Sequence, residues 1–306
     1  MTVALTKPLA LDRILAAAQL PALPNSAIRV LELARDPKNG PVEFARPIEA
    51  DPGLAMQVLK FVNSSYFGFS REISSVKQAI TLVGIRTVKN FVLWNAVFSL
   101  VPNPKCGPFD LRRLWQDSLR RAIFSRVLGK LWRLKETDEM FAAALLQDMA
   151  VPLLAKALPG DYADLLEQRA AGGGRLSDLE QARFGWTHAD AAALLADSWH
   201  LPEEFVDWMR HHASWEQLAI DPAATPAQLA IALSALLPPA IDDHWDERDQ
   251  LTAAYQQVCP ENGADLVEVL EQVDREFAEF GPLLQIGQPG PSLVARYQAA
   301  TLAVGV

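Results

Sequence analysis

The chain has 306 residues, enough for one large domain or two ordinary ones, and half of them are hydrophobic. Its formal net charge of -9 makes the surface repel phosphate backbones and anionic lipids, so we expect neither a nucleic-acid partner nor a membrane partner. Cys106 and Cys259 form no CxxC pair and the N-terminus lacks a signal peptide, which is typical of a cytoplasmic protein. We find no apolar run of about 18 residues; the longest candidate, Phe91 to Val101, is too short to span a membrane.

The N-terminal third predicts a succession of helices, because apolar residues recur at helical spacing and strand patterns are nearly absent. Helix starts are marked by Pro24, Asp51 and Ser75, and a further helix begins near Thr87. A proline-rich break at residues 101–104 then interrupts the pattern. We take this break as a candidate domain boundary.

The middle of the chain continues in the same way. A long helix is predicted from Leu111 to Leu131, and another from Phe141 to Lys156, which Pro152 should kink or divide. Further helices are expected at 162–170, 188–200 and 203–212, and Ser177 with Glu180 reads as a capping box that opens a short helix. The basic cluster on the long helix predicts a solvated face: Arg112, Arg113, Arg120, Arg121, Arg126 and Lys130.

The last ninety residues predict three or four more helices from Thr225 onward. No internal repeat of fixed period is present. We therefore divide this all-α chain into an N-terminal helical lobe at 1–100, a helical core at 101–215 and a C-terminal helical extension at 216–306 that packs on the core.

Histidine is scarce, with only five in the chain, and the candidate chemistry gathers around a few of them. Asp148 lies in a very apolar segment, so a buried carboxylate there needs hydrogen bonds, a cation or a metal. The simpler interpretation is that it accepts hydrogen bonds from a helix N-terminus or a histidine. The alternative is a metal site that Asp148 forms with His188 and with either His211 or His212.

A second candidate region is the aromatic segment that contains Asn63, Ser64, Tyr66 and Phe67 between two predicted helices. Clustered aromatic residues often mark interfaces, so this segment is a possible interaction loop. The alternative, which we favour, is a structured loop whose aromatic rings fill the seam between two lobes.

Four segments together resemble the HDOD domain, a relative of the HD phosphohydrolases. They extend over about residues 12–215, and jointly their motifs are specific. The segments are Leu-Pro-Ala-Leu-Pro at 20–24, Asp-Pro-Gly-Leu-Ala at 51–55 with Phe-Val-Asn-Ser-Ser-Tyr-Phe-Gly at 61–68, Ile-Ser-Ser-Val at 73–76 with Leu-Val-Gly at 82–84, and Phe-Gly-Trp-Thr-His at 184–188 with Trp-His-Leu-Pro at 199–202 and His-His at 211–212.

The resemblance implies a two-lobed, all-helical fold whose core is a degenerate version of the HD hydrolase core. The catalytic HD pattern has a histidine, then a His-Asp dyad, then further histidines and an aspartate. The first histidine corresponds to Asp117 and the dyad to Gln147 and Asp148. The later histidines correspond to His188 and to the pair at 211–212.

Replacing two imidazoles changes what this site can do, because an amide oxygen is a poor ligand for transition metals. Activating water at neutral pH requires a metal ion that lowers the pKa of that water. We therefore expect no catalytic residues, no metal and no cofactor. The expected function is a bacterial regulatory module that binds protein partners of a signalling pathway. The alternatives are a divergent metal-dependent phosphohydrolase and a small-molecule or nucleotide sensor that uses the vestigial cleft.

Overall fold

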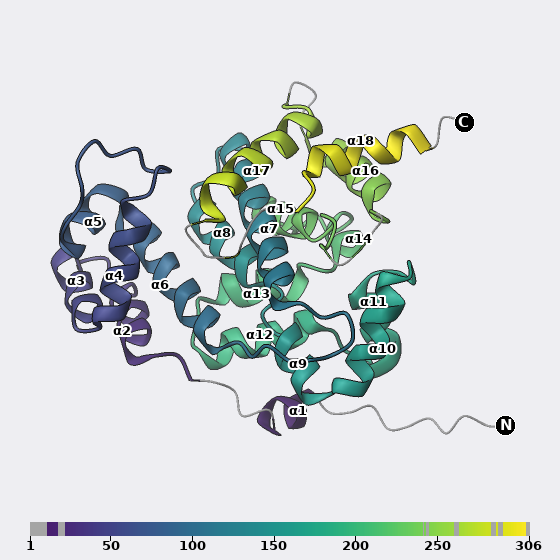
Figure 1. Cartoon of the computed structure of the whole chain (residues 1–306), viewed down its shortest axis with the longest axis horizontal. Helices are drawn as coiled ribbons and strands as arrows, with labels where there is room; N and C mark the ends of the chain where they lie inside the picture. Colours follow the sequence, from purple (N-terminus) through teal and green to yellow (C-terminus); the bar gives the residue numbers. More distant parts are fainter. Residues whose placement is uncertain are drawn as a thin grey trace.

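The computed structural model describes residues 11–17, 22–240, 242, 245–259, 263–282, 286 and 290–303. Every regular element in these residues is a helix, so the predicted all-α class is confirmed. The short α1, Leu11–Ala17, comes first. Figure 1 shows a small group of helices, α2 to α5, beside a larger body that contains the remaining long helices. The two parts correspond to the lobes expected from the resemblance.

The N-terminal lobe consists of α2 (Asn25–Leu33), α3 (Pro41–Glu49), α4 (Pro52–Val62) and α5 (Val76–Val83). Two of the predicted caps are present, because the Asp51 carboxylate accepts from the amide of Leu54 and the Ser75 hydroxyl accepts from that of Gln78. Gly84 ends α5 with φ 92°, a conformation that a side chain would strain.

One helix, α6 (Ile85–Leu100), leads from this lobe to the larger body. It begins two residues before the predicted start at Thr87 and contacts both α2 and α8. Its buried residues include Asn90 and Trp94 beside aliphatic neighbours. The helix therefore carries polar groups into the junction between the two parts.

The larger body is built around α7, Leu111–Leu131, whose bounds agree with the prediction. It packs against α8, α15 and α17, so it is covered on several sides. The predicted solvated face is wrong for half of the basic cluster, because Arg120, Arg121 and Arg126 are 2%, 9% and 7% exposed. Apolar residues lie on every side of this helix among the polar ones, as is typical of a helix inside a protein, and its charged residues are buried with them.

The segment from 137 to 157 is divided in two, as Pro152 suggested. α8 (Thr137–Leu146) ends before a turn, and α9 (Val151–Ala157) begins with proline in its first turn. By length and composition this segment is a better membrane-span candidate than Phe91 to Val101, and 83% of its most apolar stretch is buried inside the protein. Burial of that kind is typical of a core helix pair.

Five helices follow: α10 (Pro159–Ala170), α11 (Leu176–Phe184), α12 (His188–Ser198), α13 (Glu203–His211) and α14 (Trp215–Leu218). The capping box predicted at Ser177 is wrong. Residue Arg175 stands at the N-cap of α11, and Ser177 lies inside the helix. The capping box in this region joins Thr187 and Asp190 at the start of α12.

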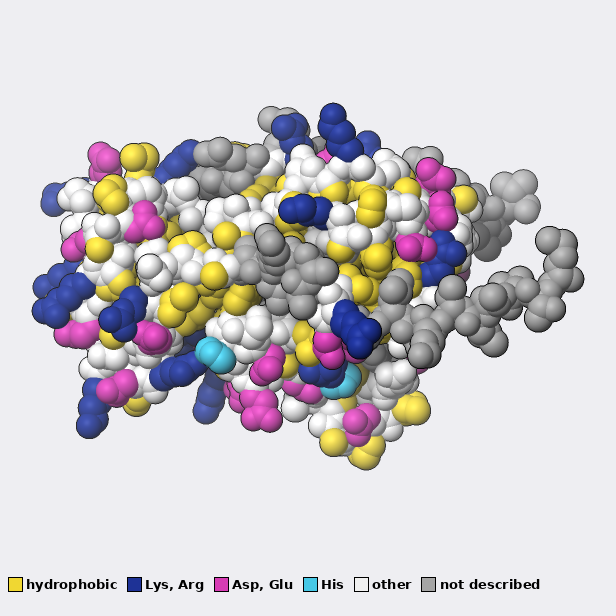
Figure 2. All heavy atoms as spheres, turned by 90° about the horizontal axis from the view of Figure 1, so that it is seen from below, with side chains coloured by type: hydrophobic (Ala, Val, Ile, Leu, Met, Phe, Trp, Pro, Cys, Tyr) yellow, Lys and Arg dark blue, Asp and Glu magenta, His cyan; other side chains and the backbone are white. Residues whose placement is uncertain are grey.

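The C-terminal part contains α15 (Pro226–Ser234), α16 (Arg248–Val258), α17 (Leu266–Phe280) and α18 (Leu293–Ala303). Both α15 and α17 pack against α7, so residues beyond 215 form part of the surroundings of the central helix. A single hydrophobic cluster runs from the N-terminal lobe through to this region. On the face in Figure 2, Lys and Arg side chains are interspersed with Asp and Glu.

Candidate functional site

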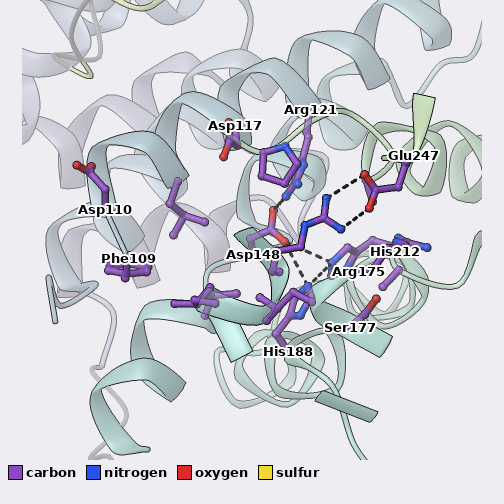
Figure 3. A pocket seen from close by; sticks show the side chains of 18 residues that line it. Phe109, Asp110, Asp117, Arg121, Asp148, Arg175, Ser177, His188, His212 and Glu247 are labelled. Carbon is purple, nitrogen blue, oxygen red and sulfur yellow. Dashed lines mark hydrogen bonds and ion pairs between the residues drawn. The ribbon is translucent and has the colours of Figure 1, made fainter. Parts of the chain in front are cut away.

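The candidate site is a cleft beside α7 whose empty volume, including the open solvent at its mouth, is about 780 Å³. Asp148 enters it from the turn between α8 and α9, where the chain changes direction. His188 enters from the first residue of α12 and His212 from the end of α13. Figure 3 shows Asp148 between Arg121 and His188. Two helix ends and a turn therefore bring these groups to one point.

Asp148, His188 and His212 form a compact triad. His188 Nε2 lies 3.2 Å from His212 Nε2 and 3.4 Å from Asp148 Oδ1, and His212 Nε2 lies 3.6 Å from the same oxygen. All three residues are buried, with exposed fractions of 4%, 6% and 1%. The sequence left open which histidine of the 211–212 pair belongs here, and the structure places His212 in the triad.

Glu180 orients the triad through its contacts with His188, and it does not form the capping box predicted with Ser177. One of its oxygens lies 2.6 Å from His188 Nδ1 and accepts from the backbone amide of His188 at 2.7 Å. The other oxygen accepts from the Tyr162 hydroxyl at 2.6 Å. Glu180 is fully buried, so these contacts fix the ring of His188 firmly.

The protonation states follow from these contacts. Burial alone would lower the pKa of His188, but Glu180 and Asp148 outweigh burial and raise it to about 10, so the ring is a cation at neutral pH. Burial lowers the pKa of His212, whose Nδ1 lies 2.7 Å from the carbonyl oxygen of Met209. His212 therefore stays neutral, donates from Nδ1 and presents the Nε2 lone pair to His188.

Arg121 of α7 forms a buried ion pair with the second oxygen of Asp148. Burial would raise the pKa of Asp148, but Arg121 and the two histidines hold it well below its usual range. The carboxylate is therefore ionised and surrounded by two cations and one neutral imidazole. The simpler early interpretation is close to this result, because the His188 imidazolium lies 3.4 Å from Asp148 Oδ1, and the residues of the alternative metal site are also brought together.

Three predicted pocket residues lie outside the triad. Both carboxylate oxygens of Asp117 accept from the amide of Ala240 at 2.9 Å, and burial raises the pKa of Asp117 to about 6. Gln147 is fully buried, and its carbonyl accepts from Ser234 of α15 at 3.4 Å. His211 is half-buried and pairs with Asp207, one turn earlier in α13, at 3.1 Å.

The triad can be tested for its fit to a metal ion. Ligand bonds of about 2.0–2.2 Å at tetrahedral angles separate the ligand atoms by about 3.3–3.5 Å, close to the distances observed here. Two imidazoles and one carboxylate therefore fit one ion, with Asp148, His188 and His212 as the ligands. Binding would require His188 to lose a proton, and it would compete with Arg121 for Asp148.

Further along the cleft, a second group of buried charged residues forms ion pairs with one another. Arg169 of α10 donates to Asp242 at 2.5 and 2.9 Å and to Glu247, whose side chain appears in Figure 3. Arg175 differs from Arg169 in its contacts. The Arg175 side chain lines the cleft, and within the described part of the chain its guanidinium forms no ion pair or hydrogen bond. Among the cleft arginines, it is the one available to an incoming anion.

The possible interaction loop lies at the junction of the two lobes. The Asn63 amide group closes the loop on both backbone groups of Ile73, at 2.7 and 2.8 Å. Ser64 is buried, while Tyr66 and Phe67 are half-buried. The Tyr66 ring packs on Phe280 of α17 with 4.1 Å between centroids. The rings fill the seam, as the favoured interpretation predicted, and a partner at this loop stays a prediction.

Comparison with known proteins gives three kinds of likeness. The HDOD domain family matches residues 20–215. An uncharacterized protein of Treponema pallidum (strain Nichols) is 23% identical over 194 residues, which are 63% of this chain and 37% of that protein. The crystal structure named "Putative phosphohydrolase from Shewanella amazonensis SB2B" has a TM-score of 0.69 and 21% identity, with 89% of this chain and 97% of that chain covered.

A further crystal structure, named "Putative signal transduction protein from Marinobacter aquaeolei VT8", has a TM-score of 0.63 and 20% identity. The likeness covers 99% of this chain and 63% of that chain. The chain thus spans less than two thirds of the length of the Treponema and Marinobacter proteins. At these identities the two solved structures establish the shared fold.

Proposed function

Since this chain belongs to the HDOD family, we propose that it is a non-catalytic signal-transduction module of the bacterial cytoplasm that binds protein partners. The likeness to a protein named for signal transduction supports this role. The observation that carries the proposal is the buried ion pair between Arg121 and Asp148. This pair joins the one acidic residue of the HD dyad to an internal cation.

The ion pair argues against hydrolysis for an electrostatic reason. A metal-activated water needs carboxylate and imidazole ligands that are free to bind the ion. Here the Asp148 carboxylate is compensated by Arg121, the dyad histidine is Gln147, and the Gln147 carbonyl is directed to Ser234. The donor set therefore fits one ion at most, whereas a two-metal mechanism needs a second set of ligands close by.

The distribution of exposed apolar side chains favours a partner-binding role. In the described residues, seven large apolar side chains are exposed, and five of them belong to the N-terminal lobe: Ile28, Val42, Met56, Phe69 and Leu82. Met56 of α4 is 70% exposed. Apolar groups that gather on one part of a surface often mark protein interaction sites.

A hydrolysis assay tests the non-catalytic part of the proposal. The purified chain is incubated with bis(p-nitrophenyl) phosphate and Mn²⁺ or Zn²⁺, beside Asp148→Asn and His188→Ala variants, and its metal content is measured. We expect all three proteins to match the buffer rate and wild type to hold substoichiometric metal. Turnover by wild type that both variants lose, together with stoichiometric metal, would establish the divergent phosphohydrolase instead.

A partner-capture experiment tests the interaction part. Wild type, Met56→Asp and Ile220→Asp are used as bait in a lysate of the source cells. Ile220 is 83% exposed and lies outside the N-terminal lobe, so it is a matched surface control. We expect a partner that wild type and Ile220→Asp retain and Met56→Asp loses. Equal retention by all three baits contradicts a role for the N-terminal lobe.

The uncommitted Arg175 favours a second candidate, a sensor that binds an anionic small molecule or nucleotide in the cleft. A ligand that binds only the folded state raises the free energy of unfolding by RT ln(1 + [L]/Kd), and so raises the melting temperature. A thermal-shift panel of nucleotides therefore tests this candidate, with Arg175→Ala as the variant that should lose the shift. A shift that Arg175→Ala retains would place the ligand elsewhere, and no shift across the panel would dismiss the sensor.

A further inference from the structure

A second cavity, the seam pocket, lies where α4 of the N-terminal lobe and the connecting helix α6 meet α7, α8 and α17 of the larger body. Its empty volume, including the open solvent at its mouth, is about 660 Å³. The wall is largely aromatic and includes Phe61, Tyr66, Phe91, Trp94, Phe141 and Phe280. The pocket shares no lining residue with the cleft described above.

Three buried polar atoms in this wall have no hydrogen-bond partner within the described part of the chain. They are Asn90 Oδ1, Trp94 Nε1 and Arg126 Nε. The residues that carry them are 6%, 6% and 7% exposed, so bulk water does not solvate these atoms. Because most buried polar atoms in proteins are hydrogen-bonded, three unpaired atoms in the wall of one cavity indicate a missing partner.

The unpaired atoms are held in place by their own side chains. The Asn90 amide nitrogen donates to the carbonyl of Asp138 at 2.7 Å, which fixes its free oxygen. Arg126 donates to Glu276 at 2.5 Å, and its guanidinium lies 4.5 Å from the centroid of the Phe141 ring. All three atoms are closed off from the cavity as well as from bulk water, so a ligand reaches this one acceptor and these two donors only when side chains of the aromatic wall move apart.

We propose that the seam pocket binds a small, planar, fused-ring heteroaromatic molecule whose edge carries both an N–H donor and a hydrogen-bond acceptor. Its faces stack on the aromatic wall, as aromatic pairs do. When the wall side chains move apart, its N–H donates to Asn90 Oδ1, and its acceptors receive hydrogen bonds from Trp94 Nε1 and Arg126 Nε. The alternative occupant is ordered water, which satisfies the same polar atoms but makes poor use of an aromatic wall.

The experiment uses adenine, hypoxanthine and quinazolin-4-one as probes, because each is a fused ring with an N–H donor and an acceptor. Naphthalene, which has the shape of a fused ring but no polar edge, is the control probe. Binding to the full chain is followed by saturation-transfer NMR and by tryptophan fluorescence. We expect saturable binding of at least one polar probe and weaker binding of naphthalene.

The decisive variant is Trp94→Phe, which removes one unpaired donor and keeps an aromatic ring. We expect it to weaken probe binding about three- to tenfold, the range of one hydrogen bond. Trp132→Phe is the matched control, because the Trp132 indole nitrogen is also buried and unpaired within the described residues but lies outside the seam pocket. Arg175→Ala, in the cleft, should leave binding unchanged, and Thr87→Trp should abolish it by filling the pocket.

Several results would overturn the proposal. Failure of all three polar probes to bind wild type would assign the unpaired atoms to water. Equal affinity for naphthalene would mean that the polar atoms do not recognise the ligand. An unchanged affinity in Trp94→Phe, or an equal loss in Trp132→Phe, would place the binding outside the seam pocket.

Discussion

The cleft and the seam pocket differ in how their buried charged groups are paired, although Arg121 Nε and Asp242 Oδ1 at the cleft also have no hydrogen-bond partner in the described residues. In the cleft, Asp148 is matched by Arg121 and His188, and Arg169 is matched by two carboxylates. In the seam pocket, three polar atoms stay unpaired among aromatic rings. A cavity lined by polar groups is therefore not by itself a better ligand site than one with an aromatic wall. A network that satisfies itself gains less from a ligand than a wall with unpaired groups.

The largest loss of stability should come from removing one partner of the buried ion pair in the cleft. Asp148→Ala leaves the Arg121 and His188 cations without their carboxylate, and removing one partner of a buried ion pair costs about 3–5 kcal/mol. Urea unfolding measures the decrease in the free energy of unfolding. The double variant Arg121→Leu/Asp148→Leu removes both charges and should recover much of the stability. Equal destabilisation by the single and double variants would mean that packing, and not charge, dominates.

A smaller effect is expected at Glu180, which orients His188. Glu180→Gln keeps the shape but removes the negative charge, so the free energy of unfolding should fall by about 2–3 kcal/mol, as for charged hydrogen bonds. The pKa of His188 should also fall from about 10, because Glu180 is a major cause of its rise. NMR titration of the imidazole protons measures this change. The exposed neighbour variant Glu167→Gln should alter neither quantity, and an unmoved His188 pKa in Glu180→Gln contradicts the assignment.

Asp117 predicts a pH dependence of stability. Burial raises its pKa from 3.8 to about 6 in the folded chain, so between these values the folded state binds more protons than the unfolded state. The stability contribution is present below about pH 4 and is lost as the pH rises through about 6, on the order of 2 kcal/mol. Asp117→Asn should flatten this slope, measured by unfolding at pH 4.5 and 7. The exposed Asp178→Asn should retain it, and a slope that survives in Asp117→Asn assigns it to other groups.

The smallest change in stability is expected for a substitution in the seam pocket, measured without a ligand. Trp94→Phe removes a donor that has no partner in the described part of the chain, which favours the variant, but it also removes buried ring volume, so the free energy of unfolding should fall by only about 1 kcal/mol. Thermal and urea unfolding measure the difference. A loss above about 2 kcal/mol would show that the indole nitrogen is already hydrogen-bonded in solution, and the contrast between the two cavities would fail.

Much of the fold follows from local patterns in the sequence. The start of α4 at Asp51 and the end of α5 at Gly84 were predictable because the cap residues act within one turn. The bounds of α7 and the division before α9 follow equally from proline and apolar spacing. Ser177 shows the limit of this reasoning. Its spacing to Glu180 fits a capping box, but the buried ring of His188 is a stronger partner for that carboxylate.

The candidate site was predictable only in part. Asp148 and His188 were identifiable because a carboxylate and a histidine are rare in such apolar segments. Choosing His212 over His211 requires the orientation at the end of α13, which adjacent positions do not reveal. Arg121 was misplaced on a solvated face because its burial depends on helices that pack around α7 from distant parts of the chain. The apolar residues on every side of that helix were the available signal.

The central helix has one consequence that concerns both cavities. Arg121 and Arg126 are five residues apart on α7, so their side chains are separated by about 7.5 Å along its axis and point about 140° apart around it. Each guanidinium forms an ion pair with a carboxylate of a different element: Arg121 with Asp148 after α8, and Arg126 with Glu276 of α17. Because Arg121 lines the cleft and Arg126 lines the seam pocket, a displacement of α7 at one cavity also moves an arginine in the wall of the other.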